Sequence, residues 1–368
     1  MCVQIYNFDE NKRQSLQITR EKMVQHEIFM QRCLQLAEIG RGSVSPNPMV
    51  GSVIVKDGRI IGEGFHQKYG ETHAEVNAIN SVNDVELLKH STLYVNLEPC
   101  SHWGKTPPCV DLIIQKQIPR VVIGAMDTHE KVCGQGILKL KKTGIEVLTG
   151  VLEQQCRELN HRFYTFHEKK RPYVILKWAQ TKDGYIDIAP LLKPSSRGLW
   201  ITNDLCRRVV HKWRAQEDSI LVGTNTALND NPSLTTRDWP GKNPLRLTID
   251  NSLKLNDGTT LLDDSTETIV FSKTSKQYGN NTSYVDIEDS SPSSILAYLY
   301  SRNIQSIIIE GGSMLLQSFI NDKMWDEARV FVGTSYFIEG VKAPLLNLRP
   351  KSSTIFDDVE LLIHTPEK

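Results

Sequence analysis

The stretch EPCSHWGKTPPC, from Glu98 to Cys109, together with HAE at His73–Glu75, decides how the first half of this chain is interpreted. One histidine, His73, and two cysteines, Cys100 and Cys109, supply three of the soft ligands that zinc prefers. Glu75 lies beside the histidine and is not needed as a ligand, so its carboxylate can carry protons. Three ligands with an adjacent proton carrier predict a catalytic zinc site.

This layout is typical of a hydrolytic zinc deaminase, in which an activated water attacks an amidine-type carbon and ammonia leaves. Nucleic-acid deaminases usually place two residues between the cysteines, whereas Ser101–Pro108 separates them here. A closed structural zinc is the alternative; it would need a fourth protein ligand, and His102 is the candidate. We favour the interpretation that His102 and Lys105 belong to the pocket wall that meets the substrate.

The composition limits the classes of function. The chain has 368 residues, enough for two domains, and its 43 basic and 43 acidic side chains give no net charge. This balance disfavours a nucleic-acid groove but leaves room for pockets that bind one or two phosphates. We find no apolar run of the ~20 residues that cross a membrane, and the first residues lack the apolar core of a signal peptide. Seven cysteines without framework spacing predict reduced thiols and a cytoplasmic location.

The apolar pattern predicts a β-β-α-β-α-β-α-β order for the first domain. The expected strands cover residues 49–55, 60–65, 92–97, 121–125 and 145–149, and the expected helices include 27–39, 73–79 and 110–117. This order places the histidine and the cysteines at the starts of neighbouring helices, where the helix dipole favours thiolates. We expect a polar extension over residues 1–24, the zinc domain over 25–150 and a linker over 151–171.

A second α/β domain is expected over residues 172–368. Its predicted strands are 173–179, 219–223, 246–250, 268–271, 306–310 and 329–333, with helices over 294–300 and 314–320. The chain lacks a GxGxxG fingerprint, so a standard dinucleotide fold is not supported. Gly311-Gly312-Ser313 stands at a strand-to-helix turn, where glycines and free N–H groups would let a phosphate approach. An ordinary tight turn is the alternative.

Several motifs resemble the bifunctional riboflavin-biosynthesis deaminase/reductase family. EPCSHWGKTPPC and SPNPMVG, at Ser45–Gly51, resemble the deaminase half; KWAQTKDG, at Lys177–Gly184, and ILVGTNTALNDNPSLTTR, at Ile220–Arg237, resemble the reductase half. The resemblance covers residues 25–365. It implies an α/β fold class, with a cytidine-deaminase-like three-layer domain at the N-terminus followed by a dihydrofolate-reductase-like α/β domain.

The same resemblance implies two reactions. The first is zinc-dependent hydrolytic deamination of 2,5-diamino-6-(5-phosphoribosylamino)pyrimidin-4(3H)-one. The second is NADPH-dependent reduction of the ribosyl group of 5-amino-6-(5-phosphoribosylamino)uracil to the ribityl product. The implied cofactors are one zinc ion per chain and NADPH, and the implied partners are small pyrimidine ribosyl phosphates, with no nucleic acid and no membrane. The sequence does not fix the oligomeric state and is compatible with a homo-oligomer.

The resemblance also assigns site residues. In the deaminase, Asn47 would hold the base, because a side-chain amide can donate to and accept from a pyrimidine edge. In the reductase, Asp230 is the candidate for a polar catalytic role. The matching substrate positions are Arg214, Leu234, Arg237 and Glu310. The matching cofactor positions are Gln180, Trp200, Thr226, Asp230, Gly312, Ser313, Met314, Leu315, Leu316, Gln317 and Ser318.

The two arginines suit a ribose phosphate, because their forked donors meet phosphate oxygens in pairs. The alternative is that each arginine forms an ordinary surface ion pair. One departure concerns Gly198, which stands where many relatives carry a small hydroxyl residue and follows the unusual segment Leu191–Ser196. The glycine puts one substrate hydrogen bond in doubt, though not the reaction.

Two competing functions stay open at the level of the sequence. A nucleic-acid base deaminase would explain the zinc ligands, but not the long insert between the cysteines, the neutral charge or the second domain. A catalytically silent binding protein with a structural zinc would explain the fold but leaves Glu75 without a role. Zinc content without ammonia release would favour this second alternative.

Overall fold

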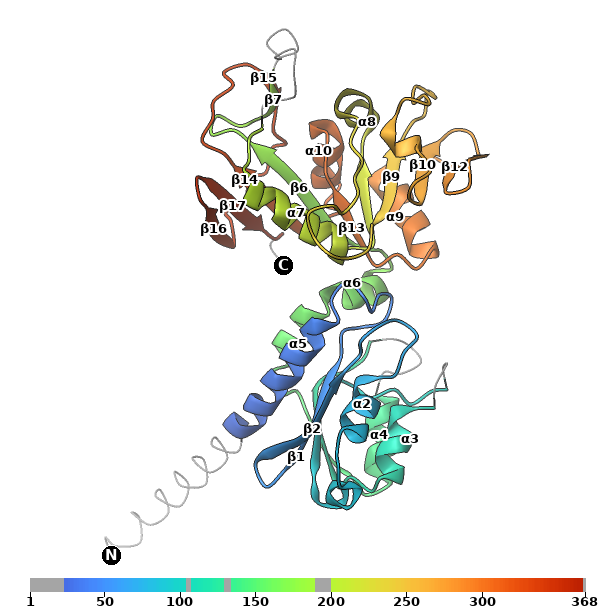
Figure 1. Cartoon of the computed structure of the whole chain (residues 1–368), viewed down its shortest axis with the longest axis vertical. Helices are drawn as coiled ribbons and strands as arrows, with labels where there is room; N and C mark the ends of the chain where they lie inside the picture. The colour runs from blue at the N-terminus through green and yellow to red at the C-terminus, as the bar shows by residue number, and fades with distance from the viewer. Residues whose placement is uncertain (1–22, 104–106, 129–133, 189–199, 367–368) are drawn as a thin grey trace, which may run out of the picture. The chain divides into compact units, whose positions relative to one another are not determined.

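A computed structural model describes residues 23–103, 107–128, 134–188 and 200–366 of the chain. The chain forms two compact units, one that ends at Glu168 and one that begins at Lys169 (Figure 1). Four features singled out above lie outside the described residues: most of the N-terminal extension, Lys105, the segment 191–196 and Gly198.

The first unit is built on a mixed five-stranded sheet with the strand order β2-β1-β3-β4-β5. Its strands are β1 (Gly51–Lys56), β2 (Arg59–Phe65), β3 (Thr92–Leu97), β4 (Arg120–Ala125) and β5 (Glu146–Thr149). β1 pairs with β2 and β3 in antiparallel fashion, whereas β3, β4 and β5 run parallel. All five predicted strands are confirmed, with ends that differ by one or two residues.

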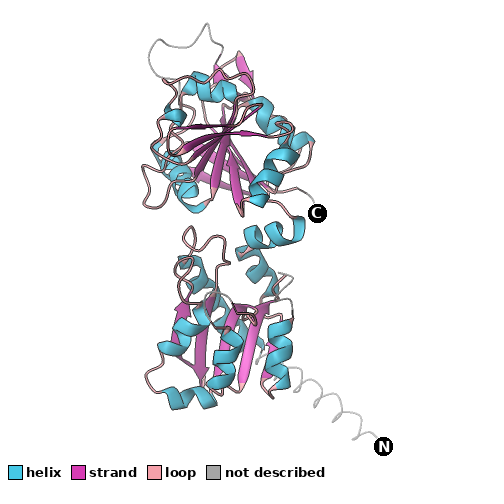
Figure 2. Ribbon diagram, turned by 90° about the vertical axis from the view of Figure 1, so that its right-hand side faces the viewer, coloured by secondary structure: helices cyan, strands magenta, loops and turns pink. Residues whose placement is uncertain are grey.

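Helices cover both faces of this sheet, which gives three layers (Figure 2). One face carries the helix over residues 23–39, α5 (Glu153–Leu159) and α6 (His161–Lys169). The other carries α2 (Ala74–Asn80), α3 (Cys109–Gln115) and α4 (Gln135–Lys142). Successive residues of β1 alternate between the two cores, with Val53 in the first and Ile54 in the second.

Two local features fix this packing. A Cβ on Gly51 would lie 2.1 Å from the carbonyl oxygen of Cys33, so only glycine lets the helix over residues 23–39 approach β1 this closely. Cys156, Phe163 and Tyr164, within the segment expected to link the halves, are buried in the core of the first unit. Their apolar side chains recur at helical spacing between charged ones, so the segment forms two amphipathic helices that pack on the sheet.

The second unit contains a ten-stranded sheet with the order β11-β12-β10-β9-β8-β13-β6-β14-β17-β16, and a two-stranded sheet of β7 and β15. Six of these strands were predicted, namely β6 (Tyr173–Gln180), β8 (Ser219–Val222), β9 (Leu245–Ile249), β10 (Thr268–Ser272), β13 (Ser306–Ile309) and β14 (Glu327–Val332). The strands not predicted are β7 (Tyr185–Ile188), β11 (Lys276–Tyr278), β12 (Thr282–Asp286), β15 (Gly340–Lys342), β16 (Ser352–Phe356) and β17 (Val359–His364).

Helices also lie on both faces of the larger sheet (Figure 2). They are α7 (Asp204–Gln216), α8 (Thr224–Asp230), α9 (Pro292–Ser301) and α10 (Ser313–Asn321), of which α9 and α10 were predicted. β9, β8, β13, β6 and β14 all run parallel, so their carboxyl ends meet at one edge. In open α/β sheets this edge is where ligands bind.

Candidate active sites

The first site lies where two helices of the first unit begin. His73 is the N-cap of α2, Cys109 is the first residue of α3, and Cys100 follows β3. His73 Nδ1 lies 3.5 Å from the sulfur of Cys100 and 3.3 Å from that of Cys109. In the described part of the chain, these three residues form the only group of histidine, cysteine and carboxylate side chains close enough to hold one metal ion.

The geometry of the three side chains fits zinc. Tetrahedral zinc, with bonds of about 2.0 Å to nitrogen and 2.3 Å to sulfur, holds these ligand atoms roughly 3.6 Å apart. Hydrogen bonding, from Cys109 and then from His73, lowers the pKa of Cys100 to about 4, and the backbone N–H of Cys109 also donates to its sulfur. Cys100 is therefore held as a thiolate, the form that binds metal. His102 is exposed and does not belong to the group.

Glu75 occupies the first turn of α2, with its side chain buried next to the ligands. Burial, and next the charge of Cys100, raise the pKa of its carboxyl group. A carboxyl group with a raised pKa takes up and releases a proton more readily near neutral pH than an ordinary glutamate. The structure thus brings together His73, Cys100, Cys109 and the proposed proton carrier.

Asn47 is oriented by a histidine that sequence reasoning missed. The amide Nδ2 of Asn47 lies 3.0 Å from Nε2 of His66, whose Nδ1 lies 3.1 Å from the carbonyl oxygen of Thr72. Since a carbonyl only accepts, the His66 ring donates from Nδ1 and accepts the Asn47 amide at Nε2. Burial lowers the pKa of His66, which favours this neutral form. The His66 ring lies 5.7 Å from that of His73, which places Asn47 near the metal ligands.

Glu98, the first residue of the EPC motif, is a second residue whose role the sequence did not indicate. Its buried carboxylate accepts backbone N–H groups from Asp127 (3.3 Å), Gly134 (3.0 Å), Gly136 (3.0 Å) and Ile137 (3.3 Å). Two of these donors meet each oxygen, so the carboxylate joins the end of β4 to the start of α4. Glu98 therefore fixes the segments beside Cys100.

The second site lies at the carboxyl edge of the larger sheet. Arg214, on α7, donates through Nε (3.2 Å) and Nη2 (2.7 Å) to the carboxylate of Glu310, which follows β13. Its Nη1 donates to the carbonyl oxygen of Thr235 at 3.2 Å. Both charged side chains are about nine-tenths buried, so Arg214 is not in an ordinary surface ion pair.

Lys177, on β6, is the third charge of this cluster. Burial would raise the pKa of Glu310, but the charges of Arg214 and Lys177 outweigh it and lower that pKa to about 2. Burial lowers the pKa of Lys177. Lys177 belongs to the KWAQTKDG motif, but no role was predicted for it. Its position inside a largely apolar, buried strand was the feature that could have indicated a functional role.

The other predicted substrate residues lie in the segment that follows α8. Leu234 is buried with φ 53°, and Arg237 is exposed. The guanidinium of Arg237 donates to the hydroxyl of Ser233, and its backbone N–H donates to Nδ1 of His211 at 2.9 Å. The structure thus places Leu234, Arg237 and the Arg214–Glu310 pair around one connected segment, because Thr235 contacts Arg214.

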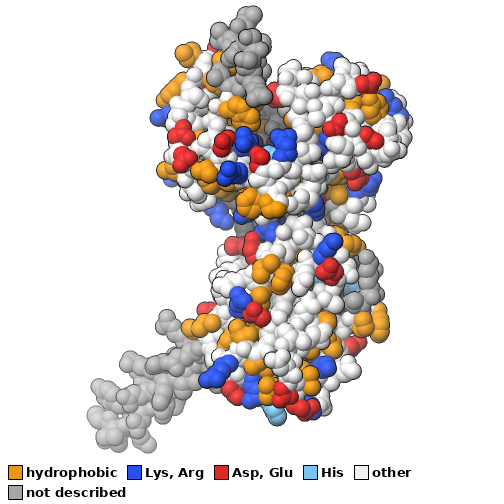
Figure 3. Space-filling view, viewed as in Figure 1, with side chains coloured by type: hydrophobic (Ala, Val, Ile, Leu, Met, Phe, Trp, Pro, Cys, Tyr) orange, Lys and Arg blue, Asp and Glu red, His pale blue; other side chains and the backbone are white. Residues whose placement is uncertain are grey.

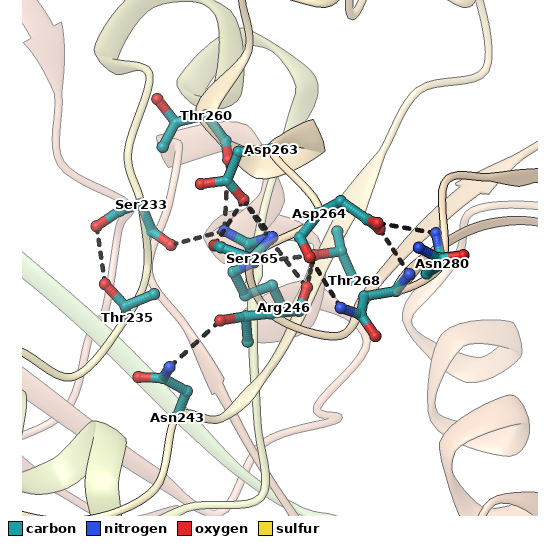
Figure 4. A network of polar contacts seen from close by, with 12 residues as sticks. Ser233, Thr235, Asn243, Arg246, Thr260, Asp263, Asp264, Ser265, Thr268 and Asn280 are labelled. Atoms are coloured by element: carbon teal, nitrogen blue, oxygen red, sulfur yellow. Dashed lines mark hydrogen bonds and ion pairs between the residues drawn. The ribbon is translucent and has the colours of Figure 1, made fainter.

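A fully buried arginine, Arg246, also contacts this segment. Figure 4 shows the guanidinium of Arg246 among Ser233, Thr260, Asp263 and Thr268. It donates to Thr268 Oγ1 (2.9 Å), to Asp263 (2.9 Å), and to the carbonyl oxygens of Ser233 and Thr260 (both 3.4 Å). Arg246 therefore ties the segment before Arg237 to the loop between β9 and β10.

The predicted phosphate-binding turn joins β13 to α10. Gly223, the N-cap of α8, donates its N–H to the carbonyl oxygen of Gly311 at 2.9 Å, so two helix starts lie side by side. Gly312 is the N-cap of α10, and no side chain caps that helix. A Cβ on Gly312 would lie 3.2 Å from Oγ1 of Thr226. The backbone N–H groups at this turn fit a phosphate.

The remaining cofactor positions differ in their surroundings. Ser313 opens α10 and Met314 is exposed, whereas Leu316 is buried in the core and Leu315 packs against it. The side chain of Gln317 donates to Asn321 and accepts the backbone N–H of Leu345. The hydroxyl of Ser318 donates to the carbonyl oxygen of Leu315. The Gln180 side chain accepts from Trp178, Trp200 is exposed, and Asp230 ends α8 one turn beyond Thr226.

Comparison with known families gives two matches. Residues 23–125 match the profile of the cytidine and deoxycytidylate deaminase zinc-binding region, and residues 172–340 match that of the RibD C-terminal domain. The first match contains His73, Cys100 and Cys109, and the second contains Arg214, Arg237 and Glu310. In the part of the chain that the structure describes, none of the helices is long and apolar enough to cross a bilayer.

Individual relatives agree with both profiles. The riboflavin biosynthesis protein RibD of Aquifex aeolicus is 38% identical over 87% of this chain and 90% of its own length. RibD of Escherichia coli is 35% identical over 84% of this chain and 88% of its own length. The crystal structure of a diaminohydroxyphosphoribosylaminopyrimidine deaminase/5-amino-6-(5-phosphoribosylamino)uracil reductase from Thermotoga maritima is 38% identical with a TM-score of 0.85, over 94% of this chain and 99% of that one.

Proposed function

Because this chain belongs to the RibD family and is therefore a bifunctional deaminase and reductase of riboflavin biosynthesis, we propose which of its residues perform the two reactions. We assign it the substrates named for the Thermotoga maritima relative, a diaminopyrimidinone ribosyl phosphate and its deaminated product. The observation that carries this proposal is the buried Glu75 beside the zinc-sized group of His73, Cys100 and Cys109.

In the deaminase, His73, Cys100 and Cys109 hold zinc. When bound, zinc supplies a Lewis acid that lowers the pKa of water to about 7. The carboxylate of Glu75 accepts the proton of the attacking water and delivers it to the leaving nitrogen, a role that its raised pKa supports. Asn47, whose amide nitrogen is held by His66, turns its Oδ1 toward a donor on the pyrimidine edge.

In the reductase, the N–H groups at Gly312 and Ser313 would hold a phosphate of NADPH, and Thr226, Trp200 and Gln180 would contact the cofactor. When bound, NADPH supplies the hydride. The ribosyl group is attached through nitrogen, so its opened form is a C1′=N imine. Reduction adds the hydride to C1′ and a proton to that nitrogen, and Lys177 is the proton donor that we propose, because burial lowers its pKa. Asp230, the candidate expected from the sequence, is exposed at the end of α8, and we keep it as an alternative to Lys177 for the polar role.

The two arginines divide the work of substrate binding. Three of the five N–H donors of Arg214 already meet Glu310 and Thr235, so its main task is to orient Glu310 toward the pyrimidine. Arg237 is exposed and contacts only the small hydroxyl of Ser233 through its guanidinium in the described structure, so it meets the ribose phosphate. Leu234 provides apolar contact beside them.

The proposal is tested by following ammonia release and NADPH oxidation with the pyrimidine ribosyl phosphate as substrate. We expect ammonia first and NADPH oxidation second. Arg237→Ala should raise the KM of the reductase step by on the order of tenfold or more, since hydrogen bonds to charged groups contribute ~1.5–3 kcal/mol. The NADPH dissociation constant should stay unchanged. A variant that loses NADPH affinity but keeps its substrate KM would overturn the assignment of Arg237.

The domain bounds, the cellular location, the partners and the oligomeric state complete the proposal. We place the deaminase in residues 25–150, with the segment 151–171 packed on it through α5 and α6, and the reductase in 172–368. The five cysteines of the described residues are free thiols, which supports a cytoplasmic enzyme. The balanced charge, visible as interspersed acidic and basic side chains in Figure 3, supports a small-molecule substrate without nucleic acid. A homo-oligomer stays a prediction, which light scattering on the full chain would test.

A further inference from the structure

One face of α7 holds the segment that carries Arg237. Arg207, His211 and Arg214 are spaced by four and three residues, so they share this face. Arg207 Nε donates to Asp238 at 2.8 Å, and Arg214 Nη1 donates to the carbonyl oxygen of Thr235 at 3.2 Å. Between them, Nδ1 of His211 accepts the backbone N–H of Arg237 at 2.9 Å. His211 is the contact that reaches Arg237 itself.

We propose that His211 is a positioning residue for the reductase substrate: its neutral imidazole fixes the backbone of Arg237 so that the guanidinium meets the ribose phosphate. This inference rests on the proposed role of Arg237 as the phosphate-binding residue. The side chain of His211 is 2% exposed, so it acts through Arg237 and does not touch the substrate. The hydroxyl of Ser233, whose carbonyl oxygen accepts from Arg246, contacts the guanidinium of Arg237.

The hydrogen bond defines the protonation state of His211. A backbone N–H only donates, so Nδ1 must carry a lone pair, and the ring proton sits on Nε2, which lies 3.7 Å from the carboxylate of Asp238. A protonated ring would carry N–H groups on both nitrogens and would lose the bond to Arg237. The charged groups that face the ring are Arg214 on α7, Arg237 and Asp238 on the segment, and Glu310 after β13.

These surroundings set the pH range in which the contact is made. Burial, then the charges of Arg214 and Arg237, lower the pKa of His211 from 6.5, against the opposing charges of Asp238 and Glu310. The neutral ring that makes the contact therefore dominates at pH 7, and the contact is lost only as the pH falls through a pKa that lies below 6.5. The substrate phosphate also gains a proton near pH 6. Wild type must thus be compared with a variant that cannot titrate.

Two substitutions separate positioning from mere packing. His211→Gln keeps an acceptor, the side-chain oxygen, but cannot titrate, whereas His211→Leu fills the space without an acceptor. We expect His211→Leu to raise the reductase KM for 5-amino-6-(5-phosphoribosylamino)uracil by on the order of tenfold. Its kcat and NADPH dissociation constant should change by less than about twofold, or ~0.5 kcal/mol, because His211 acts only on the phosphate-binding residue. His211→Gln should restore the KM at pH 7.

The pH profile supplies the readout that packing would not change. As the pH falls from 7 to the lowest value at which the enzyme stays folded, KM should rise more steeply in wild type than in His211→Gln, because only wild type loses the contact to Arg237. Arg208→Gln, an exposed position on the same helix, is the matched control and should follow wild type. If His211→Gln shows the same pH dependence as wild type, the proposal is overturned. This comparison remains available if His211→Leu fails to fold.

The failure of the underlying assignment is distinguishable. If Arg237→Ala leaves KM unchanged, Arg237 does not bind the phosphate, and the role of His211 falls with it. If Arg237→Ala raises KM while His211→Leu does not, only the positioning role is refuted. A substrate analogue that lacks the phosphate gives the final arm: the KM penalty of His211→Leu should vanish with it. A penalty of equal size on this analogue would contradict the proposal.

Discussion

Glu310→Gln should lower the stability of the second unit in a pH-dependent way. The neighbouring cations lower the pKa of Glu310 from 4.5 to about 2, against the opposing effect of burial. At ~1.36 kcal/mol for each tenfold change in acidity, this corresponds to roughly 3 kcal/mol in favour of the folded, ionised form. The glutamine removes the charge and replaces one acceptor oxygen with an NH2 group. This group is a donor, and it would face Arg214 or Lys177, which can only donate as well. The expected loss at pH 7 is therefore about 3 kcal/mol.

The sign of the pH dependence follows from the direction of the shift. A carboxyl group whose pKa is depressed by folding contributes its stability above its unfolded pKa of 4.5, and that stability is lost as the pH falls toward 2. The difference between wild type and Glu310→Gln should thus be constant from pH 7 to pH 5 and shrink below pH 4.5. At pH 3.5 wild type should have lost a visible part of its advantage.

Urea unfolding followed by tryptophan fluorescence measures this difference in the full chain. Of the six tryptophans, only Trp103 lies in the first unit, so the signal reports mainly on the second. Glu288→Gln, an exposed acid of the same unit, is the control and should change stability by less than ~0.5 kcal/mol. A loss below about 1 kcal/mol at pH 7, or a loss as large at pH 3.5 as at pH 7, would refute the reasoning.

Three further substitutions test the two sites. Glu75→Gln should retain zinc but lose ammonia release by ~10²–10⁴-fold or more, with reduction of the deaminated substrate intact; near-normal deamination by the zinc-loaded variant would contradict its role. Cys109→Ser should lower the zinc content measured by atomic absorption, because a hydroxyl is a poor substitute for a thiolate, whereas Cys33→Ala should keep its zinc. Gly312→Val should weaken NADPH binding in a fluorescence titration, because a Cβ there would lie 3.2 Å from Oγ1 of Thr226 and crowd the turn; unchanged NADPH affinity would place the phosphate elsewhere.

The sequence by itself determined the features that are local in the chain. Zinc chemistry depends on a few residue types at short spacing, so His73, Cys100 and Cys109 could be recognised without coordinates, although only His73 and Cys109 stand at helix starts and Cys100 lies in the loop after β3. The buried strands were predicted because continuous apolar runs are needed wherever both faces of a sheet are covered. The helices α7 and α8 and the strands β7, β11, β12 and β15–β17 were missed. Polar residues interrupt the apolar period of the two helices, and most of these strands are exposed or only partly buried, so they carry no continuous apolar run. The packing of α5 and α6 on the first sheet was also missed, because charged residues separate their apolar positions.

Only the tertiary structure decided which distant residues meet. Arg214 pairs with Glu310, Asn47 with His66, and Arg237 with His211, and each pair joins residues from different elements. A hydrogen bond depends on distances of about 3 Å between atoms, whereas the sequence pattern records only the type and spacing of residues. The ligands of the metal site could therefore be predicted from short motifs. The different roles that we propose for the two arginines likewise rest on tertiary contacts, since the folded chain places a carboxylate beside Arg214 and an imidazole beside the backbone of Arg237.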